Sequence, residues 1–273
     1  MESTEKDTSS KVEYSDDALD FFSDRHADTH ASFLIPYLRP GMSVLDCGCG
    51  PGSITLDLAE LVSPGEAIGI DIEQKQIERA TRLCEESDLD NVHFKVGDVT
   101  DLQFPKGSFD VVFAHGVIEY LEDPAQVFGG MRNVLRDGGI LAVRHGDWGG
   151  FLFAPEDSEA SKFFDLFVQL MQMDGGDPFF GRNQLSYLRQ AGFSDIKVSA
   201  SYDCWTSSPD VAQQVASYMA AHCISDEFIQ AIIDLGLSNR SALERISKEL
   251  MIWGDNPDAF AAEAWGEALA YKK

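Results

Sequence analysis

The fold of this chain is decided by the stretch Val44-Leu45-Asp46-Cys47-Gly48-Cys49-Gly50-Pro51-Gly52. It reads as an apolar strand that ends in an acid, followed by glycines at every second position and by a helix that begins at Ser53. Glycine is needed where the backbone turns sharply or approaches a ligand without a Cβ in the way. The amino end of the helix presents unpaired N–H groups and a positive dipole end. The stretch therefore predicts a turn that binds a nucleotide-type cofactor.

The next strand narrows the kind of cofactor. It runs as Ala67-Ile68-Gly69-Ile70-Asp71, and its terminal acid, 19 residues after Gly52, suits a ribose diol. Dinucleotide folds use G-x-G-x-x-G, whereas here the third glycine comes one residue early. The carboxylate of Asp46 would repel a pyrophosphate but suits a cofactor with an ammonium group, as S-adenosylmethionine has. A nicotinamide cofactor is the disfavoured alternative.

Three further motifs follow in order: Val96-Gly97-Asp98-Val99, then residues 109–121, then Leu135-Arg136-Asp137-Gly138-Gly139-Ile140-Leu141-Ala142-Val143. Together with the glycine turn they resemble the class I S-adenosylmethionine-dependent methyltransferases, specifically the small-molecule branch that includes the ubiquinone and menaquinone biosynthesis enzymes. The resemblance covers residues 40–144. It implies an α/β fold, a Rossmann-like, doubly wound, seven-stranded and mostly parallel sheet with helical lid insertions. It also implies S-adenosylmethionine as the cofactor.

The resemblance assigns roles to individual residues. Asp98 is expected to accept a hydrogen bond from the adenine amino group, and Val99 to lie near the ring. The end of the fourth strand is expected to face the methionine part of the cofactor. The cofactor-binding residues expected from the motifs are Asp46, Gly48, Gly50, Gly52, Asp71, Ile72, Gln76, Asp98, Val99 and His115.

The order of elements supports one shared site. Strands and helices alternate from residue 42 to about 143, which predicts a parallel sheet covered on both faces. Ligands of such sheets lie at the carboxyl ends of the strands, where Asp46, Asp71, Asp98 and His115 all fall.

Two kinds of segment are expected to cover this site. Residues 1–39 are expected to form an N-terminal helical cover with two helices over 16–39, in which Tyr14 and His30 could close over the cofactor. Residues 40–273 form the methyltransferase domain, with helical insertions at about 151–180 and 209–252. The first insertion is rich in Phe and Met, which either line an acceptor pocket or hold the helices on the sheet.

The composition bears on partners and location. The chain has 46 acids against 21 bases, a net charge of −25, so no nucleic-acid partner is expected. No apolar stretch is long enough to span a membrane and the first ten residues are polar, so no membrane partner and a cytoplasmic location are expected. Five cysteines without a C-x-x-C pair indicate reduced thiols and no metal site. A homodimer is compatible with the sequence.

Methyl transfer from a sulfonium is an in-line displacement, so the protein mainly aligns the acceptor and excludes water. A base helps where the acceptor atom carries a proton. His145, after the fifth strand, is the expected catalytic residue and Asp147 a second candidate; a capping or buried hydrogen-bonding role for His145 is the alternative. The ring of His115 is expected to be a wall of the site, and Glu119 to pack or to be solvated.

The expected function is metal-independent methyl transfer to a small, apolar metabolite. After the fourth strand the chain lacks the Asn-Pro-Pro-Tyr type of motif that enzymes methylating nucleobase amines carry. The atom that receives the methyl group, oxygen, nitrogen, sulfur or carbon, stays open. Two alternatives are a nicotinamide-dependent oxidoreductase and a non-catalytic S-adenosylmethionine-binding protein.

Overall fold

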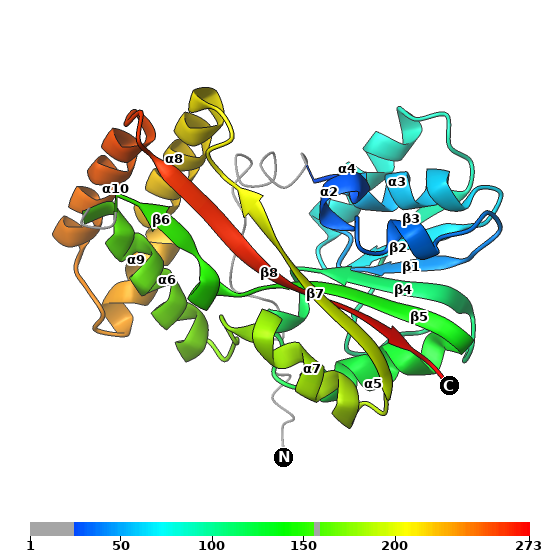
Figure 1. Ribbon diagram of the computed structural model, residues 1–273. Helices are drawn as coiled ribbons and strands as arrows, with labels where there is room; N and C mark the ends of the chain where they lie inside the picture. Colours follow the sequence, from blue (N-terminus) through cyan, green and yellow to red (C-terminus); the bar gives the residue numbers. More distant parts are fainter. Residues whose placement is uncertain (1–24, 156–158) are drawn as a thin grey trace, which may run out of the picture.

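The computed structural model describes residues 25–155 and 159–273. Its centre is an eight-stranded sheet in the order β3-β2-β1-β4-β5-β8, with β6 and β7 both paired to β8 (Figure 1). Strands β1 to β5 are parallel, and β8 is antiparallel to each of its neighbours. The Rossmann-like, mostly parallel sheet is thereby confirmed. The strands are β1 (Val44–Cys47), β2 (Ala67–Asp71), β3 (Val92–Val96), β4 (Phe109–His115), β5 (Leu135–Gly146), β6 (Leu152–Ala154), β7 (Asp195–Cys204) and β8 (Phe260–Tyr271).

The central strands are buried on both faces. Successive side chains point to opposite sides of a strand, so Leu45 packs in one core and Val44 in the other. One core is closed by α5 and α7 and the other by α3 and α4, which lie on opposite sides of the sheet in Figure 1. These helices are α3 (Ser53–Val62), α4 (Gln74–Glu85), α5 (Pro124–Val134) and α7 (Phe180–Gln190).

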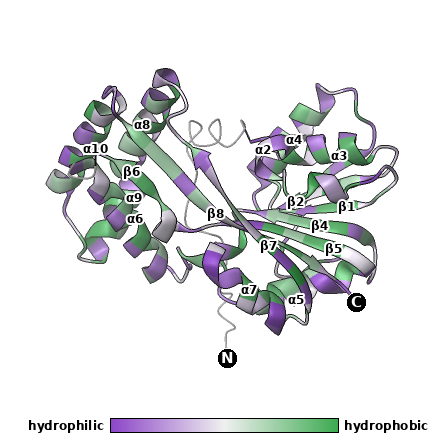
Figure 2. Ribbon diagram, viewed as in Figure 1, coloured by the Kyte–Doolittle hydropathy of each residue, from purple (hydrophilic) through white to green (hydrophobic). Residues whose placement is uncertain are grey.

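A third core is formed by four helices beside the amino end of β8 (Figure 1). The long strand β8 joins the two parts, because Ala261 near its start packs in the helical core and Leu269 near its end packs in the sheet core. Figure 2 shows mostly apolar strands, whereas these helices carry both hydrophilic and hydrophobic segments. The helices are α6 (Lys162–Met173), α8 (Pro209–Cys223), α9 (Asp226–Asp234) and α10 (Arg240–Gly254).

The starts of α8, α9 and α10 follow from local sequence. Ser208, Ser225 and Asn239 each accept a hydrogen bond from the backbone N–H three residues on, which satisfies one of the free donors of the helix that follows. The insertion expected at 209–252 is therefore helical, and no helix of the described ranges is long and apolar enough to cross a membrane.

Two segments differ from the expectation. The first of the two helices expected over 16–39 falls largely in residues 1–24, outside the described residues, as does Tyr14. The second is wrong: only the short helix α2 (Ala27–His30) and the turn η1 (Ile35–Tyr37) form. Its apolar residues are consecutive rather than spaced by three or four, and Pro36 lacks the N–H that a longer helix needs. The sheet has eight strands rather than the expected seven. The additional strand is β6, which lies inside the insertion at about 151–180 that was expected to be helical.

Candidate active site

The glycine turn between β1 and α3 forms as predicted, and its glycines have different surroundings. All three have positive φ angles, 77° at Gly48, 51° at Gly50 and 91° at Gly52. A Cβ at Gly48 would overlap the side chain of Val117, and one at Gly52 would lie 2.7 Å from Ala80. A Cβ at Gly50 would meet no other described residue within 4 Å. Packing therefore requires the outer two glycines, whereas Gly50 presents bare backbone to open space.

Two acids lie at this turn. Asp71 ends β2, where its Oδ2 accepts a hydrogen bond from Gly50 N at 3.0 Å and its Oδ1 one from Glu73 N at 2.9 Å. Asp46 is buried beneath the turn and accepts from the Thr55 hydroxyl at 2.6 Å. Burial raises the pKa of Asp46 to about 7 and also raises that of Asp71. A cationic group bound beside them would favour both carboxylates.

The remaining expected cofactor residues lie along the same edge of the sheet. Ile72 directly follows β2 and is 45% exposed. Gln76, in the first turn of α4, is buried, and its Oε1 has no hydrogen-bond partner among the residues described. After β3, Asp98 accepts from the backbone N–H and hydroxyl of Thr100, and Val99 packs in the core. The edge thus offers polar atoms and an apolar wall; the binding role of each residue stays a prediction.

His115 at the end of β4 is a buried ring. Its Nδ1 lies 3.3 Å from the carbonyl oxygen of Arg144, and its ring contacts those of His30 and Trp265 at centroid distances of 5.3 and 4.6 Å. Burial, helped by the charges of Arg25 and Arg144, holds the pKa of His115 well below its ordinary value. The ring is therefore neutral, which is compatible with the expectation that it lines the site and does not act as a base.

His145 lies deeper than the sequence suggested. Its side chain is fully buried, Nδ1 lies 3.0 Å from Gln184 Oε1 in α7, and Nε2 lies 3.7 Å from Glu119 Oε2. Phe180 packs edge-on against the ring at 4.9 Å. Burial lowers the pKa of His145 to about 4. The predicted base is thus a neutral ring that faces another protein side chain, and its catalytic role stays a prediction.

Asp147, the second candidate base, belongs to a different arrangement. Both of its oxygens accept from the Arg182 guanidinium, at 2.6 and 2.7 Å, and Oδ1 also accepts from Gly149 N. This pairing fixes the chain between β5 and α7. Within residues 25–155 and 159–273, no group of three or more His, Cys, Asp or Glu could hold a metal ion.

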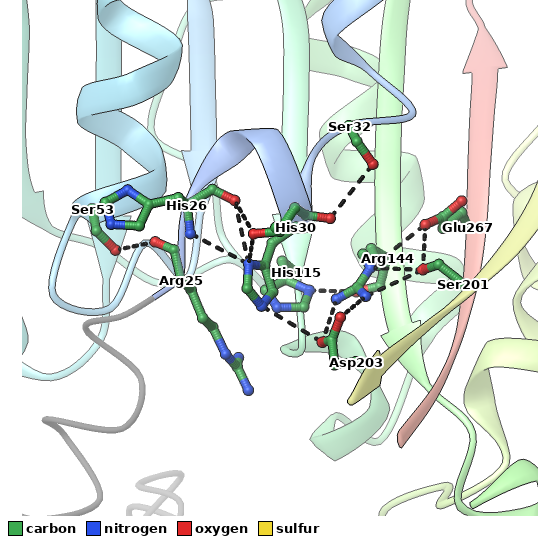
Figure 3. Close-up of polar contacts among 11 residues, drawn as sticks. Arg25, His26, His30, Ser32, Ser53, His115, Arg144, Ser201, Asp203 and Glu267 are labelled. Carbon is green, nitrogen blue, oxygen red and sulfur yellow. Dashed lines mark hydrogen bonds and ion pairs between the residues drawn. The ribbon is translucent and has the colours of Figure 1, made fainter. Parts of the chain in front are cut away.

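The structure adds a buried ionic cluster that the sequence interpretation missed (Figure 3). Arg144 in β5 is fully buried and donates to both oxygens of Asp203 in β7, at 2.7 and 3.1 Å. Glu267 lies 3.6 Å away, and the guanidinium carbon is 4.4 Å from the centroid of the Trp265 ring. His30 from the N-terminal segment approaches the same carboxylate at 3.5 Å. The sequence signal that could have indicated this cluster is the presence of Arg144 and Glu267 within the otherwise apolar strands β5 and β8.

A second set of missed polar groups surrounds Gly146 at the end of β5. Glu119 Oε1 accepts from Gly146 N at 3.3 Å, and its side chain is buried rather than solvated. A Cβ at Gly146 would lie 3.5 Å from Glu263 Oε1, 3.6 Å from Glu119 Oε1 and 3.9 Å from Trp148 Nε1. Burial raises the pKa of Glu119 to about 7 and that of Glu263 to about 8. Two carboxyl groups that hold protons near neutral pH therefore face the same point.

Comparison of the amino-acid sequence with known proteins shows the family to which this chain belongs. A sequence family described as a methyltransferase domain matches residues 38–173. A "probable methyltransferase" of Aspergillus luteorubrus is 34% identical over 153 residues, which cover 53% of this chain and 54% of that protein. An uncharacterized methyltransferase of Schizosaccharomyces pombe is 23% identical over 265 residues, 91% of each chain. The 27-O-demethylrifamycin SV methyltransferase of Amycolatopsis mediterranei is 37% identical over 119 residues, 43% of this chain and 42% of that enzyme.

Solved structures share the fold. The YcgJ protein of Bacillus subtilis superimposes with a TM-score of 0.58 at 18% identity, covering 90% of this chain and 99% of that one. Phosphoethanolamine N-methyltransferase 2 of Haemonchus contortus, solved with S-adenosylhomocysteine, gives a TM-score of 0.57 at 18% identity, covering 90% of this chain and 52% of that one. At these identities the likeness concerns the fold alone.

The chain belongs to the class I S-adenosylmethionine-dependent methyltransferases. It is accordingly an enzyme of that class, with the S-adenosylmethionine cofactor that defines the class. The match spans about half the length of the Aspergillus relative and less than half of the rifamycin enzyme, so nothing about the acceptor follows from them directly.

Proposed function

We propose that this enzyme transfers the methyl group of S-adenosylmethionine to a small, largely apolar molecule without a metal ion. The observation that carries the proposal is the open backbone at Gly50, whose N–H is held by Asp71 at the carboxyl edge of the sheet. Asp46 would face the ammonium end of the cofactor, Asp71 the ribose, and Asp98 with Val99 the adenine. When bound, the cofactor supplies an electrophilic methyl carbon on a sulfonium.

The aromatic residues that follow β5 support the proposal that the acceptor molecule is largely apolar. Trp148, which follows β5, has its ring centroid 5.4 Å from that of Phe151, 6.2 Å from Phe164, 4.8 Å from Phe167 and 6.1 Å from Trp205. These aromatic rings connect the end of β5 to the helical core. In the proposal, the insertions at 151–180 and 209–252 act as a lid that excludes water, and residues 1–39 cover the cofactor.

The class of acceptor is supported by charge and by relatives. A net charge of −25 disfavours a polyanion as acceptor. The rifamycin enzyme named above carries a small-molecule acceptor in its name. A small-molecule acceptor, a cytoplasmic location and a possible homodimer complete the proposal.

The proposal is tested by calorimetry followed by turnover. S-adenosylhomocysteine should bind the full chain, and NAD should not. A pool of small acceptors with S-adenosylmethionine labelled in its methyl group, followed by mass spectrometry, should then give labelled product. Cofactor affinity without product from any acceptor in a broad pool would favour the non-catalytic alternative, and absence of S-adenosylhomocysteine binding would refute the proposal.

A further inference from the structure

Glu119 lies between the glycine turn and the end of β5. The side chain of Val117 fills the space that a Cβ at Gly48 would occupy, so the segment after β4 packs directly on the turn. Glu119 follows two residues later, in the turn η2 (Ile118–Tyr120), and reaches Gly146 N with its Oε1. Its carboxyl group therefore stands where the cofactor turn and the carboxyl end of β5 meet.

One oxygen of this carboxyl group is incompletely bonded. In the described part of the chain, neither Glu119 Oε2 nor His145 Nε2, which are buried 3.7 Å apart, has a hydrogen-bond partner. An amide oxygen only accepts, so the contact with Gln184 Oε1 places the hydrogen of His145 on Nδ1 and leaves the lone pair on Nε2. Buried polar atoms left unpaired are rare, and two side by side indicate a site that a further group completes.

We propose that this group is a hydroxyl of the methyl acceptor, that Glu119 accepts its proton, and that His145 and Gln184 act as positioning residues for Glu119. The inference rests on the proposed methyl transfer. His145 does not take the proton directly from the acceptor, because its ring lies behind Glu119, next to Phe128 and Phe180, whereas Glu119 reaches Gly146 N at the carboxyl end of β5.

A hydroxyl fits this place better than a cation or a hydrocarbon. The guanidinium groups of Arg25 and Arg144 both act electrostatically on the neighbouring Glu263, so two positive charges already share this end of the sheet. A protonated amine would add a third and has no lone pair with which to attack. An apolar carbon acceptor would leave Glu119 Oε2 unpaired. A hydroxyl donates to Oε2 and keeps a lone pair for the methyl carbon.

The step balances without a further reactant. The hydroxyl oxygen forms the bond to the methyl carbon, the carbon–sulfur bond breaks with its electron pair left on sulfur, and the hydroxyl proton moves to Glu119 Oε2. The His145 Nε2 lone pair then accepts a hydrogen bond from that Oε2–H. Burial raises the pKa of Glu119 to about 7, opposed by backbone hydrogen bonds including that from Gly146 N and by the charge of Arg25, so the carboxyl group can gain and lose a proton near neutral pH.

Binding of two matched probes tests this assignment without knowledge of the natural acceptor. The protein saturated with S-adenosylhomocysteine is titrated at pH 7.5 with 4-fluorophenol and with 4-fluoroanisole, which lacks the hydroxyl proton, and followed by fluorine NMR. The phenol should bind at least about tenfold more tightly. Glu119→Met should reduce this preference to within about threefold, whereas Glu122→Gln, a change on an exposed neighbour, should preserve it.

The outcomes separate this inference from the proposed function. No preference for the phenol, or a preference that survives in Glu119→Met, would overturn the hydroxyl assignment. Failure of S-adenosylhomocysteine to bind the wild-type protein would instead overturn the proposed function. If Glu119→Met does not fold, the isosteric Glu119→Gln decides: its product formation should fall at least about a hundredfold while S-adenosylhomocysteine affinity stays within threefold. Undiminished turnover, or a labelled product methylated on nitrogen, sulfur or carbon, would also overturn it.

Discussion

The proposed cofactor half and the proposed acceptor half of the active site are built in different ways. The proposed cofactor half is mainly backbone: three glycines within residues 48–52, with Asp71 at the end of β2 accepting from Gly50 N and Asp46 in β1 accepting from the Thr55 hydroxyl beneath the turn. The proposed acceptor half, Glu119 with the neighbouring Arg144–Asp203 cluster, is made of side chains from η2, β5, β7, β8 and the N-terminal segment, which only the fold brings together. A cofactor site can thus be a local property of the sequence, whereas the proposed acceptor site depends on the tertiary structure.

The largest effect that tests this contrast concerns Gly50. Gly50→Val places a branched side chain at a φ of 51° and in the open space proposed for the cofactor. S-adenosylhomocysteine affinity by calorimetry should fall at least about a hundredfold with the fold retained. Gly138→Val is the matched control, because Gly138 also has a positive φ and no other described residue within 4 Å of a Cβ, but lies at the opposite end of β5. Equal affinity in the two variants would place the cofactor elsewhere.

The same contrast explains how much of the fold could be predicted. Strand β4 contains the apolar run Val111–Ala114, and β1 lies between Pro40-Gly41 and the glycine turn, so the places of both strands follow from short stretches of sequence. The N-terminal segment was harder, because a run of consecutive apolar residues around Pro36 has no helical or strand period. Strand β6 was missed because three residues pair only with the long strand β8, a partner more than one hundred residues away.

The candidate site divides in the same way. The turn glycines, Asp46 and Asp71 lie where the motif predicts, since their spacing is local. Arg144 gave only the signal of a charge within an apolar strand, because its partner Asp203 comes from β7 and the two residues meet only when β5, β7 and β8 are aligned. Glu119 was interpreted as packed or solvated, since sequence does not show that its carboxyl reaches β5.

A second prediction breaks the acceptor half while sparing the cofactor half. Asp203→Ala removes the bidentate partner of Arg144 and leaves its fully buried charge with the Ser201 hydroxyl as hydrogen-bond acceptor and Glu267, 3.6 Å away, as the nearest carboxylate. The free energy of unfolding should fall by about 3 kcal/mol, as for a buried pair that loses one member. Asp195→Ala, on the exposed start of β7, is the control and should change little. Denaturant unfolding of both variants checks this; a loss below about 1 kcal/mol in Asp203→Ala would mean that Ser201 and Glu267 suffice to compensate Arg144.

A third prediction concerns Asp71, the side chain that contacts the glycine turn in the proposed cofactor half. Asp71→Ala removes the acceptor for Gly50 N and the carboxylate proposed to bind the ribose hydroxyls. S-adenosylhomocysteine binding should weaken by about 1.5–3 kcal/mol, the range for hydrogen bonds to a charged group. Asp90→Ala, an exposed acid before β3, serves as the control. Calorimetry that shows unchanged affinity for Asp71→Ala would remove the ribose assignment.

The smallest expected effect is on the pH dependence of kcat/KM, which distinguishes Glu119 from His145 as the base. Burial lowers the pKa of His145 to about 4, so a base at His145 is already unprotonated at pH 5.5 and kcat/KM would not change above that value. Glu119 must lose its proton before it can accept one, and its pKa of about 7 makes kcat/KM rise with pH, with a midpoint near 7. With an acceptor identified from the pool, we expect kcat/KM to rise with pH around a midpoint near 7, as for Glu119.

His145→Ala then tests the positioning role. It should lower turnover at least about tenfold, the lower end for acid–base groups, with S-adenosylhomocysteine affinity within threefold. The midpoint of the pH profile should also move, because Nε2 lies 3.7 Å from the oxygen that titrates and its loss changes the surroundings of that proton. A ring that only fills space would reduce the rate without moving the midpoint, and a profile flat from pH 5.5 to 8.5 in the wild-type enzyme would return the base assignment to His145.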